Sequence, residues 1–315
     1  MKNILVVGSI NMDIVIKVEH IPKIGETVIA KEVNYSFGGK GANQAVAIAK
    51  LGGNVTMIGR VGDDNFGKEL IENLDKQKVK PSGIEIDKTE KTGMAFIYVS
   101  DKGENNISVN QGANKKLDVE QINRHLDLFD AAEICVLQLE IPIETVKYAI
   151  EICNKKNIKV ILNPAPARKI PEEILKNIYI LTPNESELSI LTKKNVKTIE
   201  DINNASEILL ESGVQNIITT LGEKGCFLKN KNDSLHFAAV QVDAIDTTAA
   251  GDSFTGAISI ALNNGKSIKE AIEFATYVSA LTVTKEGTQD SLPDKLEVEK
   301  FINERREVHE KNNFA

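Results

Sequence analysis

Short apolar runs without polar interruption recur along the chain, and they constrain its fold more than any other feature. Each run is followed by polar or small residues and then by a helical pattern. A strand that is apolar on both faces must be covered on both sides, and strands that alternate with helices form parallel sheets. We therefore predict an α/β protein with helices on both faces of a central, mainly parallel sheet. The runs are Ile4–Val7, Ile134–Leu137, Val160–Leu162, Tyr179–Leu181 and Ile217–Ile218.

Two other stretches alternate between apolar and polar residues and predict a small antiparallel sheet beside the main one. The first is Asp13–Val18 followed by Thr27–Ala30, and the second is Gly93–Ser100 followed by Glu104–Asn110. No repeat or flexible linker divides the 315 residues. We expect a single domain over residues 1–315, with segments of about 13–35 and 93–111 forming the small sheet.

Charge and composition exclude several classes of function. The net charge of −7 and the absence of tryptophan argue against a nucleic-acid-binding protein, which needs a basic surface or stacking aromatic residues. The sequence contains no run of 18 apolar residues, so we predict no membrane span. Three scattered cysteines without CxxC spacing favour buried free thiols and a cytoplasmic location.

Polar side chains gather where the apolar runs end. Asn11 follows the first run, Glu140 the second, Asn163 the third and Asn184 the fourth. Ligands of open parallel sheets bind at the carboxyl ends of the strands. The sequence therefore predicts a site for a polar ligand along this edge.

The strongest single motif is Asp246-Thr-Thr-Ala-Ala-Gly-Asp252, which opens a predicted helix. Small residues before a helix let backbone N–H groups converge on an anion at its positive end. Asp252 would lie beside that anion as a base for an incoming hydroxyl group, which is the pair of functions that phosphoryl transfer requires. On local grounds alone, Asp252 is equally well explained as a carboxylate that complements the helix dipole.

A second glycine-rich loop, Phe37-Gly-Gly-Lys-Gly-Ala-Asn-Gln44, is neither a Walker A loop nor a dinucleotide fingerprint. Lys40 and Asn43 are suited to hydrogen-bonding a polyol, but a glycine turn before a helix would explain the loop as well. Asn11 and Asp13, two residues apart on an extended segment, point to the same face and suit adjacent sugar hydroxyls.

Taken together and in this order, the motifs resemble those of the ribokinase-like family of carbohydrate kinases. They are Gly8-Ser-Ile-Asn-Met-Asp, Gly38-Gly-Lys-Gly-Ala-Asn, Gly59-Arg-Val-Gly-Asp-Asp, Gln138-Leu-Glu, Asn163-Pro-Ala-Pro-Ala, Thr182-Pro-Asn-Glu and Asp246-Thr-Thr-Ala-Ala-Gly-Asp. The resemblance runs from about Asn3 to Pro293. It implies a three-layer α/β/α sandwich in which the small β-sheet is a lid over the sugar, and it favours the members that phosphorylate D-ribose at O5 with ATP.

The resemblance also implies a role for each matching residue. Asp252 would be the general base, and the amides of Ala249, Ala250 and Gly251 would form the anion hole. The sugar would be held by Asn11, Asp13, Gly39, Lys40, Asn43 and Glu140. The nucleotide would contact Asn184, Thr220, Gly222, Gly225, Gly251 and Thr276.

Two metal ions are implied in the same way. Glu187 would position Mg²⁺ through water. A K⁺ activator would be held largely by backbone carbonyls at Asp246, Thr248, Thr282, Lys285, Gly287 and Ser291. Family members also form homodimers through their lids, for which Ile14, Ile16 and Val18 offer an apolar face.

Some positions depart from the family pattern, and several alternatives stay open. Relatives often have a small residue at the position of Met12, His at the position of Thr276 and Pro at the position of Asp290. Glu140 is also suited to a surface ion pair and Lys40 to a solvated loop.

Alternative functions are a kinase for 2-deoxyribose, fructose or a nucleoside, and a non-catalytic sugar-binding homologue. A dinucleotide oxidoreductase would need a glycine fingerprint after the first strand, which this chain lacks.

Overall fold

A computed structural model describes residues 3–313 and the side chains of residues 3–305. Its centre is a nine-stranded sheet in the order β13-β12-β11-β10-β9-β8-β1-β4-β5. All neighbours from β11 to β5 are parallel, and β12 and β13 are antiparallel additions at one edge. The strands are β1 (Asn3–Val7), β4 (Val55–Gly62), β5 (Val79–Asp87), β8 (Ala132–Leu137), β9 (Lys159–Leu162), β10 (Ile180–Leu181), β11 (Asn216–Thr220), β12 (Cys226–Asn230) and β13 (Ser234–Phe237). The five predicted apolar runs thus correspond to β1, β8, β9, β10 and β11.

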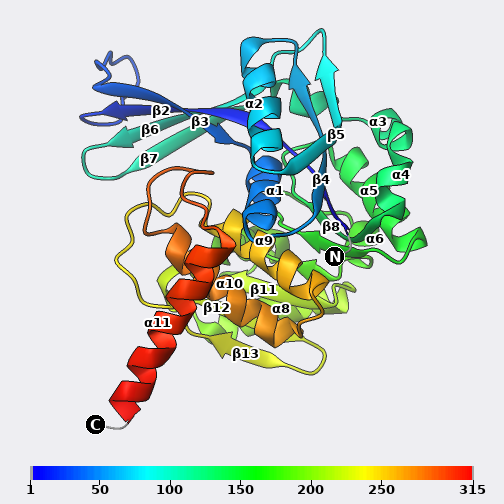
Figure 1. Ribbon diagram of the computed structural model, residues 1–315, viewed down its shortest axis with the longest axis vertical. Coiled ribbons are helices and arrows are strands. Elements are labelled where there is room, and N and C mark those ends of the chain that lie inside the picture. Colours follow the sequence, from blue (N-terminus) through cyan, green and yellow to red (C-terminus); the bar gives the residue numbers. More distant parts are fainter. Residues whose placement is uncertain (1–2, 314–315) are drawn as a thin grey trace.

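Helices cover both faces of this sheet, so the predicted three-layer sandwich is confirmed (Figure 1). Along β1, Ile4 and Val6 belong to one core cluster and Leu5 and Val7 to the other. The first cluster includes residues of α1 (Lys40–Lys50), α2 (Asn65–Lys76), α9 (Ala250–Asn263), α10 (Ile268–Thr282) and α11 (Lys295–Asn313). The second includes residues of α3 (Val119–Arg124), α4 (Leu126–Asp130), α5 (Ile143–Lys155), α6 (Glu172–Leu175), α7 (Glu185–Thr192) and α8 (Ile199–Glu211). Short 3-10 helices lie at Gly112–Lys116 (η1) and Gly222–Lys224 (η2).

The small sheet projects from the sandwich, at the upper left of Figure 1, and corrects two predictions. Its order is β3 (Glu32–Gly38), β2 (Asn11–Val18), β6 (Gly93–Ser100) and β7 (Asn105–Asn110). The partner of β2 is β3, and the predicted strand Thr27–Ala30 is a loop instead, because the pairing register aligns Asn11 with Gly38.

The small sheet is also mixed rather than antiparallel, since β2 and β6 pair in parallel. Both strands leave the same edge of the main sheet, β2 after β1 and β6 after β5, and therefore run in the same direction.

The apolar surface of the small sheet differs from the prediction as well. Val18 is buried, and Ile14 and Ile16 are half-buried. The exposed apolar side chains of this sheet lie on its outer strands instead: Val33, Tyr35, Ile107 and Val109.

The prediction for the cysteines is confirmed, because all three are buried free thiols. Gly52 follows the C-cap residue Leu51 of α1 with a φ of 86°, and Pro142 immediately precedes α5. Within the part of the chain that the structure describes, no helix has the length and apolar character needed to cross a bilayer.

Candidate active site

The amino termini of α1 and α9 meet at the carboxyl edge of the main sheet. Asp252 lies in the first turn of α9 and is 6% exposed. Its carboxylate accepts hydrogen bonds from two amide side chains of α1: Asn43 Nδ2 donates at 3.0 Å and Gln44 Nε2 at 2.9 Å. The two helices approach closely because Gly256 of α9 faces Ala47, whose Cβ would be 2.8 Å from a Cβ at position 256. Helix packing therefore fixes the carboxylate.

The predicted sugar-binding residues surround this carboxylate. Glu140 Oε2 accepts hydrogen bonds from Ser9 Oγ at 2.5 Å and from the Lys40 amide at 3.2 Å. Its carboxylate therefore lies at the site, and the described residues include no cation in an ion pair with it. Gly39 has a φ of 89°, and a Cβ there would meet the Asn11 nitrogen at 2.7 Å. The glycine thus allows the loop to lie directly against β2.

Asn11 is buried and has a fixed orientation. Its Oδ1 accepts a hydrogen bond from Asn114 Nδ2 at 2.8 Å, and Asn114 also exchanges hydrogen bonds with the backbone of Ile10. The Asn11 oxygen is therefore engaged, and its amide nitrogen is the group presented to a ligand. No motif in the sequence pointed to Asn114, which belongs to η1.

Four carboxylates, those of Asp13, Glu140, Glu187 and Asp252, and the ammonium group of Lys40 determine the charge of the site. Burial raises the pKa of Asp13 to about 7; repulsion from Glu140 and Asp252 adds to this effect, and Lys40 opposes it. Asp13 Oδ1 is buried without a hydrogen-bond partner.

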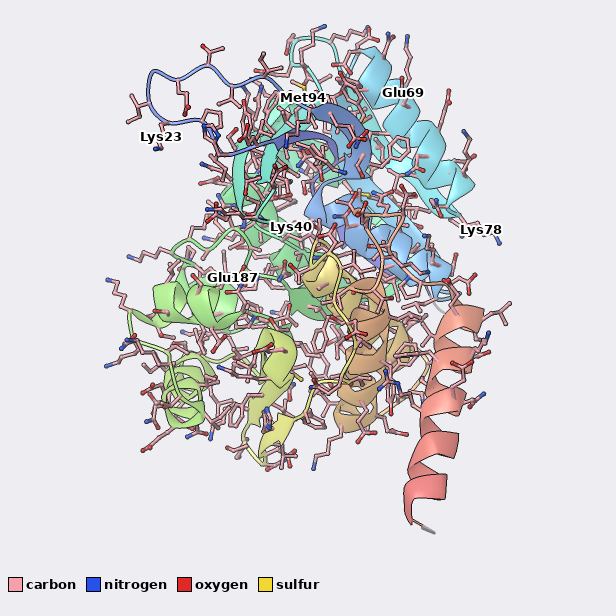
Figure 2. All side chains as sticks on the ribbon, turned by 90° about the vertical axis from the view of Figure 1, so that its left-hand side faces the viewer. Lys23, Lys40, Glu69, Lys78, Met94 and Glu187 are labelled. Carbon is pink, nitrogen blue, oxygen red and sulfur yellow. The ribbon has the colours of Figure 1, made fainter. Side chains whose placement is uncertain are left out.

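Lys40 is half-buried between the small sheet and the sandwich (Figure 2). Burial lowers its pKa, but Asp252, Glu140, Glu187 and Asp13 outweigh this effect and raise the pKa overall. The ammonium therefore stays charged and belongs to the site rather than to a solvated loop.

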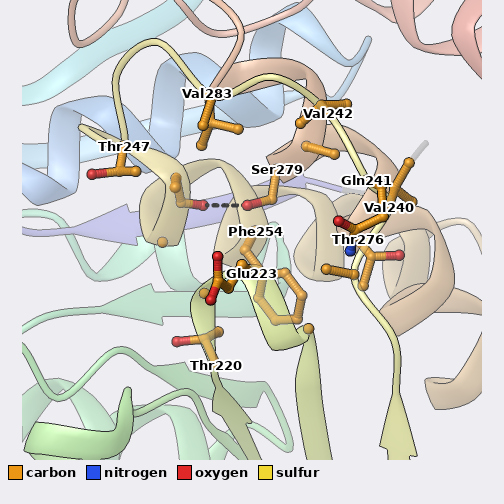
Figure 3. A pocket seen from close by; sticks show the side chains of 17 residues that line it. Thr220, Glu223, Val240, Gln241, Val242, Thr247, Phe254, Thr276, Ser279 and Val283 are labelled. Atoms are coloured by element: carbon orange, nitrogen blue, oxygen red, sulfur yellow. Dashed lines mark hydrogen bonds between the residues drawn. The ribbon is translucent and has the colours of Figure 1, made fainter.

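A cavity of about 410 Å³ opens on the other side of the α9 amino terminus (Figure 3). It includes the predicted nucleotide residues Thr220, Gly222, Gly225, Gly251 and Thr276. Much of its apolar wall was not predicted from the sequence. This wall comes from an irregular segment before the Asp246 loop, from α9, and from the end of α10 with the residue that follows it. Its residues are Ala239, Val240, Val242, Ala244, Phe254, Ala280 and Val283. An apolar cavity with few polar groups is suited to a planar aromatic base.

A smaller cavity of about 200 Å³ connects the two regions. Lys40, Asp252, Asn184 and Glu187 line it, and Thr220, Thr247 and Gly251 line both cavities. Asn184 and Glu187 form the capping box of α7, with the Asn184 amide donating to Glu187 Oε2 at 2.9 Å. Burial raises the pKa of Glu187. The polar cavity is suited to a phosphate chain and a hydrated cation.

The proposed anion hole lies at the boundary of the two cavities. Ala249 precedes α9 in the left-handed conformation, with a φ of 60°, and a Cβ at Gly251 would meet no atom within 4 Å. The Ala250 amide donates to the Thr247 carbonyl at 3.3 Å. The first turn of α9 therefore faces open space at Gly251, as an anion site requires.

The predicted K⁺ positions lie on two loops that Asp246 joins. Its carboxylate accepts hydrogen bonds from the amides of Thr248 at 2.8 Å and Gly287 at 3.0 Å. The Lys285 ammonium is turned away, toward Glu297. Of the remaining positions, Thr282 ends α10 and Ser291 is buried in the second loop. The predicted K⁺ positions would offer oxygen atoms, chiefly of backbone carbonyls, and such donors suit a hard monovalent cation, whereas the described residues form no cluster of three or more His, Cys, Asp or Glu side chains.

Comparisons with known proteins identify related chains. Residues 1–295 match the model of the pfkB family carbohydrate kinases. A ribokinase from Haemophilus influenzae is 41% identical over 302 residues, which cover 96% of this chain and 98% of that protein. A deoxyribokinase from Salmonella typhi is 39% identical over 292 residues, covering 92% and 95%.

This chain is also similar to a solved structure over nearly its whole length. The ribokinase from Arabidopsis thaliana, complexed with ribose and ATP, superposes with a TM-score of 0.90 at 36% identity, covering 95% of this chain and 98% of that one.

The raised pKa of Asp13 makes a prediction about stability. Between the ordinary value of 3.8 and about 7, the folded protein retains a proton that the unfolded chain has lost, so the protein loses stability as the pH rises through this range. Asp13→Asn removes this loss. We expect the free energy of unfolding of the variant to rise relative to that of the parent by at most about 1.4 kcal/mol per pH unit, with no further rise above pH 7. Urea unfolding between pH 5 and 8 measures the difference.

The matched control is Asp75→Asn, which changes an exposed carboxylate of α2. It should show no gain that grows with pH. If the unfolding free energies of Asp13→Asn and the parent differ by the same amount at every pH, the pKa of the buried Asp13 carboxyl is not raised.

Proposed function

Because this chain belongs to the pfkB family of carbohydrate kinases, we propose that it transfers the γ-phosphoryl group of ATP to O5 of D-ribose. The observation that carries the proposal is the position of Asp252. Its carboxylate lies between a polar cluster of Asn11, Asp13, Lys40 and Glu140 and the end of α9 that faces the larger cavity.

On the acceptor side, the sugar hydroxyls would bind the polar cluster. The Asn11 amide nitrogen donates to one hydroxyl, and the Asp13 and Glu140 carboxylates accept from others. A hydroxyl bound to Asp13 would supply the partner that its buried Oδ1 lacks. Asp252 then accepts the proton of the attacking hydroxyl while its two amide partners hold it in place.

On the donor side, the base of ATP would occupy the apolar cavity and its phosphates the smaller polar one. The Gly251 end of α9 faces the transferring group, so its amides stabilise the negative charge that develops there. Lys40 adds a positive charge on the acceptor side of the same cavity.

Two cations complete the proposal. Glu187 would hold Mg²⁺ through water, since Mg²⁺ bound to a nucleotide keeps most of its water and needs one or two carboxylates. The Asp246 loops would hold K⁺ and thereby stabilise the amino terminus of α9. These ions supply charge neutralisation at the phosphates and order in the loop.

The comparisons favour a second candidate as well, because a deoxyribokinase is nearly as similar as a ribokinase. The two substrates differ by the 2-hydroxyl group alone. A buried polar group that is left without its partner costs about 1–3 kcal/mol. Asn11 and Glu140 are buried or half-buried polar groups of this kind, so we favour ribose.

Removal of the base tests the mechanism. We expect Asp252→Asn to lower kcat by about 10²–10⁴-fold, the range for loss of a general base, because the amide cannot take the hydroxyl proton. Coupled measurement of ADP formation gives the rate, and binding of ATP should be retained. Near-normal turnover in this variant would sink the assignment of Asp252.

A panel of sugars tests the acceptor. With ATP, Mg²⁺ and K⁺ present, D-ribose should exceed 2-deoxyribose in kcat/KM by roughly tenfold or more, and fructose and nucleosides should be poorer still. A higher value for 2-deoxyribose would make the chain a deoxyribokinase. Binding of sugar without any ADP formation would point to a non-catalytic homologue.

The small sheet would act as a lid that closes over the sugar and excludes water, so that the sugar rather than water receives the phosphoryl group.

We also propose that two copies of the chain pair through the small sheet. Val33 and Tyr35 leave exposed apolar surface on β3, on the same face of the sheet as Ile14 and Ile16 and on the face opposite to Asp13. Sedimentation velocity should find a species of twice the chain mass, and Val33→Lys should shift it toward the monomer. A parent protein that sediments as a monomer would rule the pairing out.

A further inference from the structure

We propose that Gln289 is a positioning residue for the base: it fixes the orientation of Asn43 so that the amide nitrogen of Asn43 points at Asp252. This inference rests on the proposed function, because it assigns Asp252 the role of base. Gln289 lies between Gly287 and Ser291 in the second loop of the predicted cation site, and its side chain leads away from that site toward α1.

The geometry is a chain of three hydrogen bonds that all run toward the carboxylate. Asn73 Nδ2 of α2 donates to Gln289 Oε1 at 2.7 Å, and Gln289 Nε2 donates to Asn43 Oδ1 at 3.2 Å. Asn43 Nδ2 then donates to Asp252 Oδ2 at 3.0 Å. We call this set the amide chain.

Chemistry alone dictates these directions. An ionised carboxylate only accepts hydrogen bonds, so Asn43 must turn its NH₂ group toward Asp252. Its oxygen then faces Gln289, which must therefore present an NH₂ group in turn. The oxygen of Gln289 is left for the NH₂ group of Asn73. Each link of the amide chain thus determines the orientation of the next.

Burial makes a reversal costly. Asn73, Gln289 and Asn43 are 8%, 2% and 5% exposed, so water is poorly placed to replace a lost partner. The backbone around Gln289 is also held, because Lys50 Nζ of α1 donates to the carbonyls of Gln289 at 2.8 Å and Leu292 at 2.9 Å. The orientation of Asn43 is therefore set by a fixed loop.

The other oxygen of Asp252 is held independently. Gln138 Nε2 donates to Gln44 Oε1 at 2.6 Å, and Gln44 Nε2 donates to Asp252 Oδ1. Loss of Gln289 should therefore release one oxygen of the base and leave the other held. This predicts a partial loss of turnover rather than its abolition.

The informative substitution is Gln289→Glu, which keeps the shape but has only acceptors. Asn43 would then turn its NH₂ group to position 289 and its oxygen toward the Asp252 carboxylate, which repels it. We expect kcat to fall by roughly 10–100-fold, as for a misplaced catalytic group, while the KM for ATP stays within about twofold. Gln289→Met, which cannot force this reversal, should lose less.

A double variant separates positioning from general disruption. In an Asn43→Ala background the amide chain is already broken, so adding Gln289→Glu should change kcat by less than about twofold. The matched control is Gln121→Glu. Gln121 is equally buried, and its side chain bonds to the carbonyls of Gly59 and Gly83 and to the guanidinium of Arg60 rather than to the amide chain. It should lower thermal stability and leave kcat near the parent value.

The outcomes are distinguishable. If the parent phosphorylates sugar and Asp252→Asn does not, but Gln289→Glu keeps the parent kcat, the positioning role is wrong and the proposed function stands. Additive losses in the double variant, or an equal loss of kcat in Gln121→Glu, would also overturn it. If the parent shows no phosphorylation or Asp252→Asn is fully active, the proposed function itself has failed.

Discussion

The close contact between α1 and α9 is the constraint on which the rest of the site depends. α1 brings Asn43 and Gln44 to the two oxygens of Asp252, and it begins at Lys40 beside Glu140. α9 brings Asp252 and a first turn that faces open space at Gly251. Because Gly256 lets the helices approach, the proposed base, its two amide partners and the proposed anion site belong to one rigid unit.

Everything else is attached to this pair from the edge of the main sheet. The polar residues that follow β1, β8 and β10 supply walls of the proposed acceptor and phosphate regions, and the small sheet begins where β1 and β5 end. The second loop of the predicted cation site has two neighbours: Thr288 Oγ1 donates to the Phe37 carbonyl of β3, and Gln289 Nε2 donates to Asn43 of α1. A single loop thus contacts both the small sheet and one of the two amide partners of Asp252.

Much of this was readable from the sequence because its signals are local. Buried parallel strands appear as apolar runs, and small residues followed by an Asp indicate the amino terminus of a helix, as at α9. The errors have tertiary causes: the position of β3 and the parallel pairing of β2 with β6 depend on where distant strands leave the main sheet. Gln289 and Asn114 were invisible because their partners are more than a hundred residues away in the chain.

The shared lining of the two cavities has a stereochemical consequence. Thr220, Thr247 and Gly251 border both, so in the proposed reaction the leaving oxygen departs into one cavity while the attacking oxygen arrives from the Asp252 side. The entering and leaving oxygens then lie on opposite faces of the phosphorus atom, as in-line displacement requires. A single transfer of this kind inverts the configuration of a phosphorus atom made chiral by oxygen isotopes. A covalent phosphoryl-protein intermediate, with its two displacements, would retain it.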